Sequence, residues 1–406
     1  MVAVLAKVFG TENLQVAEDV VQDTLLQAME IWKLKGAPDN PSAWLYRVAK
    51  NKAIDILRRN KFSVQYDFSD NDRILLQSEY TMSTVMENLW KEEMVQDDLL
   101  RMMFACCHPD ISEENQITLI LKTLCGFSTA EIARSFLTTE DTISKRLYRT
   151  KEFFRERKIR PEFPPTDHLK SRANAVLRTI YLIFNEGYNS THTDVMIRKD
   201  LLEQAMYLCD QLCSNVHTRL PEVYAAMALM CFHAARIDSR MGGEGEIILL
   251  PKQDRSKWNT QLICDGSAYL DKAAIGSEVS SYHIEAAIAF EHCAAPRFGD
   301  TNWAHILVLY TWLDAIAPST IVQLNRLTVI GKVHGNEAVL QEIEQSARIP
   351  EWEKHFLYHS ILGEIYSSTD KEKALLCYEK AVQLTQSISE KKLLRKKIAM
   401  LGTMTK

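Results

Sequence analysis

Glycine and proline are scarce in this sequence, which contains fourteen of the first and eleven of the second among 406 residues. Both residue types interrupt helices, and the stretches between them are rich in Ala, Leu, Glu, Lys and Gln, which favour helices. Small and apolar side chains also recur at the three-to-four spacing of a helix. Near the N-terminus these are Val16, Val20, Val21, Thr24, Leu25 and Ala28. We therefore predict an all-α chain.

The length and composition predict a globular protein of two or three domains. A chain of 406 residues exceeds a single hydrophobic core of ordinary size. Charged residues make up 25% and the nine hydrophobic types 46%, as in folded rather than disordered proteins. No window approaches eighteen consecutive apolar residues, and the N-terminus lacks the basic region and cleavage site of a secretory signal. We expect a cytoplasmic protein with no membrane partner.

The nine cysteines are an odd number scattered along the chain, which indicates reduced thiols. Two groups could supply metal ligands, namely Cys106-Cys107-His108 and Cys209 with Cys213. Neither group is matched by a second pair at the spacing of a zinc site, and cysteine is also an ordinary core residue. We expect no metal site and no cofactor.

Positive charge is concentrated in two segments, although the formal net charge is −5. Residues 44–61 hold six basic side chains against one acid, and residues 145–160 hold eight against two. Between them, residues 62–95 hold seven acids and two basic side chains. Two basic segments separated by an acidic spacer indicate two contacts with one polyanion. The alternative is that each basic segment is only a solvated helix face.

Breaks in the helical pattern divide the chain into four parts. They are a helical segment at residues 1–61, an acidic linker at 62–95, a second helical segment at 96–160 and a longer helical region at 166–406. In the first segment, Ser42 is expected to cap the helix that follows Pro41. Prolines end the second segment at Pro161, Pro164 and Pro165.

The strongest local pattern predicts a helix-turn-helix at residues 128–157. Ala133 is small enough for two helices to cross closely, and apolar side chains hold the crossing at Ile132, Phe136, Ile143 and Leu147. Helical spacing turns a polar and basic set outward, suited to base edges and phosphates in a major groove. This set comprises Thr142, Ser144, Lys145, Tyr148, Arg149 and Glu152. The turn of this motif usually contains glycine, so the bulky Leu137 predicts a different turn geometry.

A second basic segment, residues 41–59, interleaves cations with aromatic and amide side chains. Such a pattern suits single-stranded DNA, because cations follow the backbone while a ring or an amide meets an unstacked base. An amphipathic surface helix with Trp44 and Tyr46 in the core explains the segment equally well. The segment alone does not choose between these two interpretations.

Three segments in order resemble the extracytoplasmic-function family of RNA polymerase sigma factors. Residues 17–28 are similar to the segment that docks on the clamp helices of core RNA polymerase. Residues 40–51 resemble the segment that melts and recognises the −10 promoter element, and residues 131–149 resemble the domain that binds the −35 element. The first helix of such a domain is short here, or the chain begins upstream of Met1.

Four further segments resemble the subgroup of this family that carries a long tetratricopeptide-like extension at the C-terminus. They are Phe104–Pro109, Tyr181–Tyr188, Asp254–Trp258 and Leu324–Arg326. A partial tetratricopeptide pattern also occurs at Leu362, Gly363, Tyr366, Ala374, Tyr378 and Ala381. The resemblance implies two small helical sigma domains joined by a linker, the second with the helix-turn-helix, and a large C-terminal helical domain that regulates them.

The resemblance also implies partners and site residues. Core RNA polymerase would contact Asp19, Gln22, Asp23 and Thr24. The melted −10 strand of promoter DNA would contact Trp44, Arg47, Lys50, Asn51 and Arg58. The −35 duplex would contact Ser144, Lys145, Tyr148 and Arg149, with Arg146 on phosphate or on a neighbouring acid. A regulatory protein or ligand would bind the C-terminal domain.

Two other functions remain open at this point. A one-component transcriptional regulator explains the helix-turn-helix and the helical C-terminus but leaves residues 44–59 unused. If the protein is instead a helical protein-interaction scaffold, both basic segments are only solvated helix faces. An enzyme is disfavoured because the sequence has no paired metal-ligand motif, phosphate loop or nucleophile elbow. The polar run Asn185-Glu186-Gly187-Tyr188 suits a ligand site, but a helix C-cap at Gly187 is the plainer interpretation.

Overall fold

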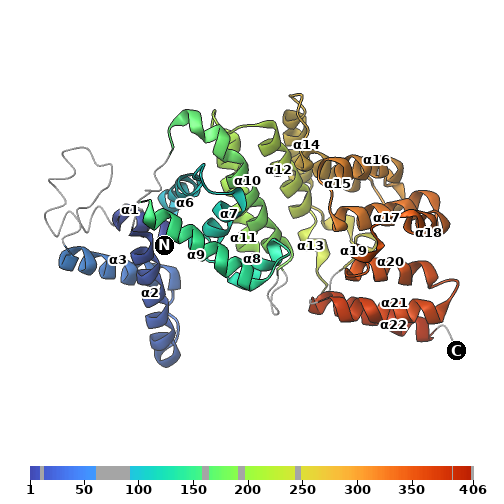
Figure 1. Ribbon diagram of the computed structural model, residues 1–406, viewed down its shortest axis with the longest axis horizontal. Coiled ribbons are helices and arrows are strands. Elements are labelled where there is room, and N and C mark those ends of the chain that lie inside the picture. The colour runs from blue at the N-terminus through green and yellow to red at the C-terminus, as the bar shows by residue number, and fades with distance from the viewer. Residues whose placement is uncertain are drawn as a thin grey trace. The chain divides into compact units, whose positions relative to one another are not determined.

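The computed structural model describes residues 1–9, 13–60, 92–157, 164–190, 197–242, 248–385 and 387–403. Over these residues the chain is built from helices without a β-strand, which confirms the predicted all-α fold (Figure 1). Most of the predicted linker, residues 62–91, lies outside the described ones. Its last part, residues 92–95, belongs to helix α6 (Glu92–Cys106).

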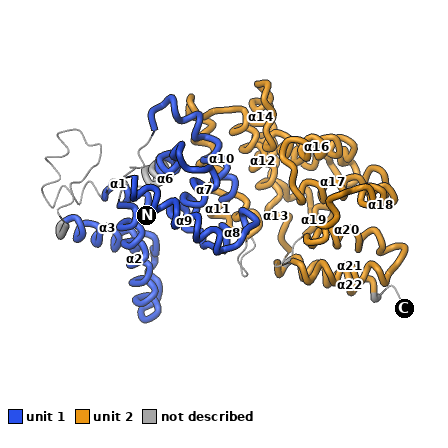
Figure 2. Tube along the Cα trace, viewed as in Figure 1, with its two compact units in different colours: residues 1–183 blue, residues 184–406 orange. Residues whose placement is uncertain are grey.

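The chain forms two compact units, Met1–Ile183 and Phe184–Lys406 (Figure 2). The division falls inside helix α10 (Thr166–Tyr188), beyond the proline-rich break where the sequence predicts a domain limit. The first part of α10 belongs to unit 1, where Arg172 Nη1 donates to the Phe104 carbonyl oxygen at 3.0 Å. Arg178 forms an ion pair with Glu113, also at 3.0 Å. The predicted end of the second helical segment at residue 160 and the predicted start of the C-terminal region at residue 166 stay predictions.

Helix α1 (Val2–Phe9) is the centre of the first part of unit 1, and its Val4, Leu5 and Ala6 are 0% exposed. Helices α2 (Leu14–Lys35) and α6 pack on α1, and α3 (Pro41–Asn60) packs on α2. All four contribute to one apolar cluster. The same cluster therefore holds together helices from the first and the second predicted sigma domains.

The second part of unit 1 continues with α7 (Glu113–Thr123), α8 (Thr129–Ser135) and α9 (Glu140–Glu156). Helix α7 packs on α6, and α7, α8 and α9 pack on one another. Their contacts bury Ile117, Ile132 and Ile143 completely. Burial of these apolar faces leaves the opposite face of α9 open to solvent.

Unit 2 consists of short helices that pack mainly on near neighbours in the chain, as in helical repeat proteins. With η marking a 3-10 helix, they are α11 (Lys199–Ser214), α12 (Pro221–Ala234), α13 (Ile237–Arg240), η2 (Leu250–Lys252), η3 (Arg255–Lys257), α14 (Thr260–Ala273), α15 (Ser281–Ala294), η4 (Phe298–Asp300), α16 (Trp303–Ile316), α17 (Thr320–His334), α18 (Asn336–Gln345), α19 (Ile349–Trp352), α20 (Phe356–Tyr366), α21 (Lys371–Leu384) and α22 (Ile388–Thr403). The largest contacts join α12 to α14 and α15, α16 to α17, and α20 to α21.

Gly187 does not cap a helix, and the sequence interpretation was wrong at this position. Helix α10 continues through Gly187 to Tyr188. A Cβ atom at position 187 would lie 2.9 Å from Cγ of Leu202, which belongs to α11. Glycine is needed here because α11 approaches closely, and not because the backbone turns left-handed.

None of the described helices combines the length and the apolar character needed to cross a bilayer. Cys106, Cys107 and Cys209 are free and buried in helical packing. Burial raises the pKa of the Cys106 thiol to about 12, so it behaves as an apolar core group. Over the part of the chain that the structure describes, no three potential metal ligands come together.

Helices α20 and α21 pack closely at Gly363, which belongs to the partial tetratricopeptide pattern. A Cβ atom there would lie 2.7 Å from the ring of Tyr378, which is 2% exposed. Replacing Gly363 with Ala should lower the free energy of unfolding by about 1–2 kcal/mol, because overpacking outweighs the gain in helix propensity. Urea unfolding followed by circular dichroism measures this change.

Gly299→Ala is the matched control, because a Cβ atom at Gly299 would meet nothing within 4 Å. Its free energy of unfolding should change by less than about 0.5 kcal/mol. Equal unfolding midpoints for the two variants would contradict the close packing of α20 on α21.

Candidate nucleic-acid interface

The exposed face of α2 carries most of the side chains predicted to contact polymerase. Asp19, Gln22 and Asp23 are exposed on the face opposite the apolar cluster. Gln22 and Asp23 both lie about one helical turn from Asp19. Gln15 Nε2 donates to Asp19 Oδ1 at 3.0 Å. Leu26 and Met29, 58% and 70% exposed, extend the surface along the helix. The result is an acidic surface that continues into an apolar one.

Thr24 is separated from this surface. It is 0% exposed, and its hydroxyl donates to the Val20 carbonyl oxygen at 2.7 Å. A buried threonine that satisfies its hydroxyl on its own helix has a structural role. The predicted contact of Thr24 with polymerase does not agree with this burial.

Helix α3 presents part of the predicted −10 set. Arg47 and Asn51 are exposed, whereas Trp44 and Lys50 are partly buried. The Trp44 ring meets the edge of Trp32 in α2, with centroids 5.5 Å apart, so this ring contributes to the packing of α2 on α3. Arg58 belongs to α3, but its side chain lies outside the described residues.

The start of α3 differs from the sequence prediction. The helix begins at Pro41, and Asn40 caps it by accepting a hydrogen bond from the Ala43 amide at 2.9 Å. Ser42 is inside the first turn and does not cap it. Proline suits the first helical position, since its missing N–H would have no partner there. The preceding asparagine therefore takes the cap position.

The predicted helix-turn-helix falls on α8 and α9. A capping box starts α8, in which the Ser128 amide donates to Glu131 at 2.6 Å and the Glu131 amide donates to Ser128 Oγ at 3.2 Å. Thr139 caps α9 by accepting from the Thr142 amide at 3.3 Å. Ala133 is buried with Ile132 where the two helices cross, in agreement with the predicted inward set.

The turn between these helices keeps a left-handed residue, so the predicted change of turn geometry was wrong. Leu137 has a φ of 51°, the conformation that glycine usually supplies. The Thr138 amide donates to the Ala133 carbonyl oxygen at 2.8 Å and closes the turn. The Leu137 side chain is 80% exposed, so its bulk meets no obstacle.

The outer face of α9 brings together four of the residues predicted to contact the −35 element. Ser144, Lys145, Tyr148 and Arg149 are all exposed, and Tyr148 is 68% exposed. Lys145 Nζ lies 2.6 Å from Asp141 Oδ2 in an exposed pair, which salt and a competing phosphate weaken easily. This face therefore offers cations, hydroxyls and an aromatic ring together.

Arg146 turns away from that face. Its guanidinium lies 2.6 Å from Glu114 and 5.5 Å from the centroid of the Phe136 ring. Of the two alternatives that the sequence left open, the structure therefore places Arg146 on a neighbouring acid. The pair holds α9 on α7.

Sequence reasoning missed an ion pair between α2 and α9. Lys151 Nζ lies 2.7 Å from Glu18 Oε2, and the Glu18 side chain is only 12% exposed. The two residues are 133 positions apart, and no local pattern predicts such a pairing. Each residue looks like an ordinary member of a charged helix face.

Comparison with known proteins gives the family. Residues 1–63 match Sigma-70 region 2. The ECF RNA polymerase sigma factor SigL of Mycobacterium tuberculosis is 31% identical over 133 residues, which cover 32% of this chain and 68% of SigL. The chain belongs to the ECF RNA polymerase sigma factors. The predicted family is thus confirmed.

This ECF sigma factor carries a large C-terminal helical extension. Residues 172–274 of it match a family of unknown function, DUF6596. An uncharacterised protein of Rhizobium meliloti (strain 1021), R00370, is 31% identical over 379 residues, which cover 93% of this chain and 88% of that protein. No solved structure shows significant similarity to the chain.

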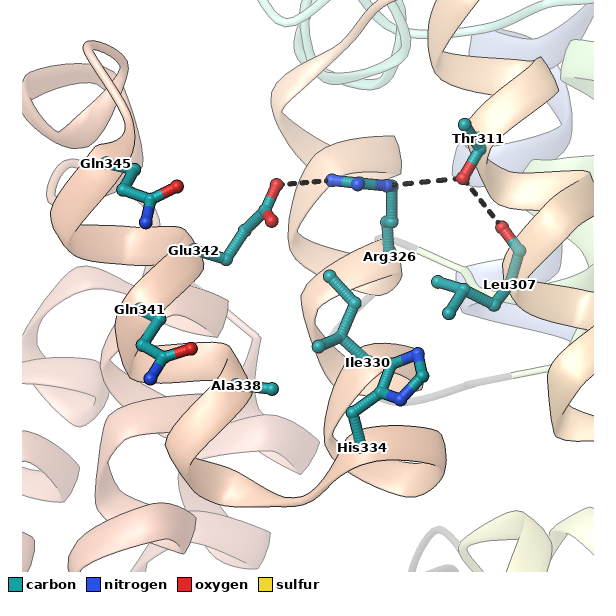
Figure 3. Close-up of a pocket in the computed structure, with 9 residues that line it drawn as sticks. All are labelled: Leu307, Thr311, Arg326, Ile330, His334, Ala338, Gln341, Glu342 and Gln345. Carbon is teal, nitrogen blue, oxygen red and sulfur yellow. Dashed lines mark hydrogen bonds and ion pairs between the residues drawn. The ribbon is translucent and has the colours of Figure 1, made fainter.

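The extension contains a polar cleft between α16, α17 and α18, of about 340 Å³. Figure 3 shows Arg326 in its wall, between Glu342 and Thr311. Arg326 Nη1 lies 2.8 Å from Glu342, and Nε donates to Thr311 Oγ1 at 3.4 Å. Arg326 belongs to one of the segments on which the resemblance rested, and the carboxylate beside it already neutralises its charge.

Replacing Leu137 with Gly should stabilise α8 and α9 in this sigma factor by about 1 kcal/mol, because a left-handed residue with a Cβ costs about 1–2 kcal/mol. Little apolar burial is lost. Hydrogen exchange of the α9 amides in the full chain measures the gain.

Leu26→Gly is the control, since Leu26 is also exposed but lies inside α2. It should destabilise unit 1 by about 1 kcal/mol, the usual cost of glycine in a helix. Loss of protection in both variants would show that the Leu137 backbone carries no strain.

Proposed function

We propose that this ECF sigma factor binds core RNA polymerase and directs transcription initiation at specific promoters. The match of residues 1–63 to Sigma-70 region 2 carries this proposal, and the outward faces of α2 and α3 support it. Residues 1–61 would bind polymerase and the −10 element, and residues 96–160 would bind the −35 element. The protein would act in the cytoplasm, where both partners are found.

Polymerase binding is assigned to Asp19, Gln22 and Asp23 on α2. These side chains are exposed, and the apolar cluster behind them fixes the helix. Leu26 and Met29 supply apolar area beside the charges. Thr24 supports the surface from inside and makes no contact with the partner.

Promoter recognition is assigned to α3 and α9. On α3, Arg47, Lys50 and Asn51 would hold a single strand, while Trp44 would offer the part of its ring that Trp32 leaves open. Arg58 is assigned to the same DNA strand on the family resemblance alone. On α9, acting as the second helix of a helix-turn-helix, Lys145 and Arg149 would enter the major groove, with Ser144 and Tyr148 beside them.

Regulation is assigned to the C-terminal extension, proposed as a tetratricopeptide-like domain of residues 166–406. It is larger than the sigma portion, and its repeated helix pairs resemble those that bind peptides and proteins in solenoids. Helix α10 supplies a covalent link, because it begins in unit 1 and ends in unit 2. A regulatory protein or ligand bound to unit 2 would therefore act on a helix whose Arg172 and Arg178 contact α6 and α7.

Replacing Asp23 with Lys should weaken binding to core RNA polymerase about tenfold, because the charge reversal lies within the proposed contact. The fold should not change, since Asp23 is exposed. Affinity for core polymerase is measured by titration with labelled sigma factor. The matched control Asp39→Lys reverses an exposed charge outside α2 and should bind like the wild type.

Wild-type protein that does not bind core polymerase at all would exclude the proposed function. Equal weakening by the Asp23 and Asp39 variants would instead place the contact elsewhere on the molecule.

Replacing Arg149 with Ala should cost about 1–3 kcal/mol of binding at the cognate promoter and relax the preference at one base pair. Replacing Arg146 with Ala should leave promoter preference unchanged and lower the stability of unit 1, because Arg146 pairs with Glu114. Promoter binding by the holoenzyme and thermal unfolding of the free protein separate the two effects.

A uniform loss over all DNA sequences, with a flatter salt dependence, would reassign Arg149 to phosphate. Wild-type affinity in a Lys145→Ala and Arg149→Ala double variant would remove α9 from the DNA interface.

A further inference from the structure

Unit 2 contains a cluster of arginine, histidine and tyrosine side chains that the proposed function does not use. It comprises Arg236, Arg240 and Arg255 with His233, His292 and Tyr188. These residues come from α10, α12, α13, η3 and α15 and from the turn after α12. Arg236 is 9% exposed, and the other five are partly exposed, so the cluster is recessed but reaches solvent.

Arg236 and Arg240 are held around Tyr188. Arg236 Nη2 donates to the Tyr188 hydroxyl at 3.2 Å and to His233 Nδ1 at 3.1 Å. Arg240 donates to the Tyr188 carbonyl oxygen, and its guanidinium carbon lies 3.9 Å from the centroid of the Tyr188 ring. An arginine has no acceptor, so His233 must accept with a neutral ring.

Arg236 and Arg255 also lie near one indole ring. The Trp258 ring centroid is 5.9 Å from the guanidinium carbon of Arg236 and 4.4 Å from that of Arg255. Trp258 is 5% exposed, and its Nε1 donates to Ser239 Oγ at 2.8 Å, which fixes the ring. The indole and the tyrosine thus hold three guanidinium groups in one small region.

Three buried nitrogen atoms of the cluster have no partner in the described part of the chain, and the two arginine nitrogens among them are donors without acceptors. Within the described residues, Arg236 Nε, Arg255 Nη2 and His292 Nδ1 are buried and have no hydrogen-bond partner. Buried polar groups are nearly always satisfied, and each exception asks for an explanation such as an unseen ion. Some donors do have structural roles, because Arg255 Nη1 donates to the His292 carbonyl oxygen at 2.7 Å. The remaining donors are left over after those roles are filled.

No described carboxylate forms an ion pair with these three arginines. Burial is the main reason why the pKa of His233 lies well below its usual value, and the nearby Arg236, Arg240 and His292 lower this pKa further. Burial together with Arg236 and Arg255 lowers the pKa of His292 to about 4. Asp300 acts on Arg255 from the surface, but it is paired with Arg297 at 2.9 Å. The described protein groups therefore leave this positive charge uncompensated.

We propose that Arg236, Arg240 and Arg255 form a binding site for a small molecule that carries a phosphate group with two or more negative charges. Guanidinium groups bind phosphate oxygens through paired N–H donors. Three guanidinium groups carry more positive charge than the single negative charge of one carboxylate can balance. All residues of the site belong to unit 2, so ligand binding does not depend on the proposed function. Only a regulatory role of the ligand rests on it.

Two of the segments singled out in the sequence meet at this site. Tyr188 ends the segment that begins at Tyr181, and Arg255 and Trp258 belong to the segment 254–258. All site residues except His292 lie within residues 172–274, the part that matches the family of unknown function. The cleft at Arg326 is a weaker candidate, because Glu342 already neutralises its arginine.

The test is calorimetric titration of the full chain, without polymerase, with inorganic pyrophosphate as the probe. The expected result is saturable binding and a rise of about 5 °C in the unfolding temperature at a pyrophosphate concentration 100 times Kd. Acetate and sodium chloride at the same ionic strength should give less than about 1 °C, since neither matches the charge of the site.

Arg240→Met and Arg255→Met should each weaken pyrophosphate binding at least tenfold, whereas Arg348→Met, at an exposed arginine of unit 2, should leave it unchanged. Arg240→Lys keeps the charge and removes the paired donors, and it should bind with intermediate affinity. This variant keeps the test decisive if a Met variant does not fold, which circular dichroism would show.

Absence of binding to the wild type, or wild-type affinity in Arg240→Lys, would overturn the proposal. An equal rise in unfolding temperature with acetate would also overturn it. None of these outcomes bears on polymerase binding, which is measured separately through Asp23.

Discussion

The burial of α1 is the constraint on which unit 1 depends. Val4, Leu5 and Ala6 have no exposed surface, because α2 and α6 pack on α1 and α3 completes the cluster. Seven of the eight residues of α1 have apolar side chains, so α1 needs partners on most of its sides. The faces of α2 and α3 that point away from α1 are then free to carry polar side chains. Packing thus decides which residues of α2 and α3 stay exposed for the proposed contacts.

Much of this organisation could be predicted from local sequence. Helix periodicity and the inward set of α8 and α9 depend on neighbours within one or two turns. Other features depend on distant partners. Thr24 is buried by packing, Gly187 is required by Leu202, and Arg146 finds Glu114 on another helix. A single sequence shows such side chains without their neighbours. The family resemblance therefore placed Thr24 at a partner, and the local pattern placed a cap at Gly187.

Positive charge is used in two different ways in the two units. On α9, Lys145 and Arg149 are hydrated, so a phosphate can replace water at little cost. In unit 2, Arg236 is nearly buried and its donors have already lost water. A ligand there would recover hydrogen bonds that the empty fold lacks. The first kind of site favours fast and salt-sensitive association, and the second favours selection of one ligand by shape and charge.

The contact between Lys151 and Glu18 has a geometric consequence for a sigma factor that reads both promoter elements. Sites centred at −10 and −35 are about 25 base pairs apart, or roughly 85 Å along the duplex axis. A compact unit of 183 residues has a diameter of roughly 40 Å. Bending so short a duplex sharply is costly. If the chain reads both elements at once, as proposed, α9 has to leave α2, and the ion pair and the shared apolar cluster would then belong to a closed form.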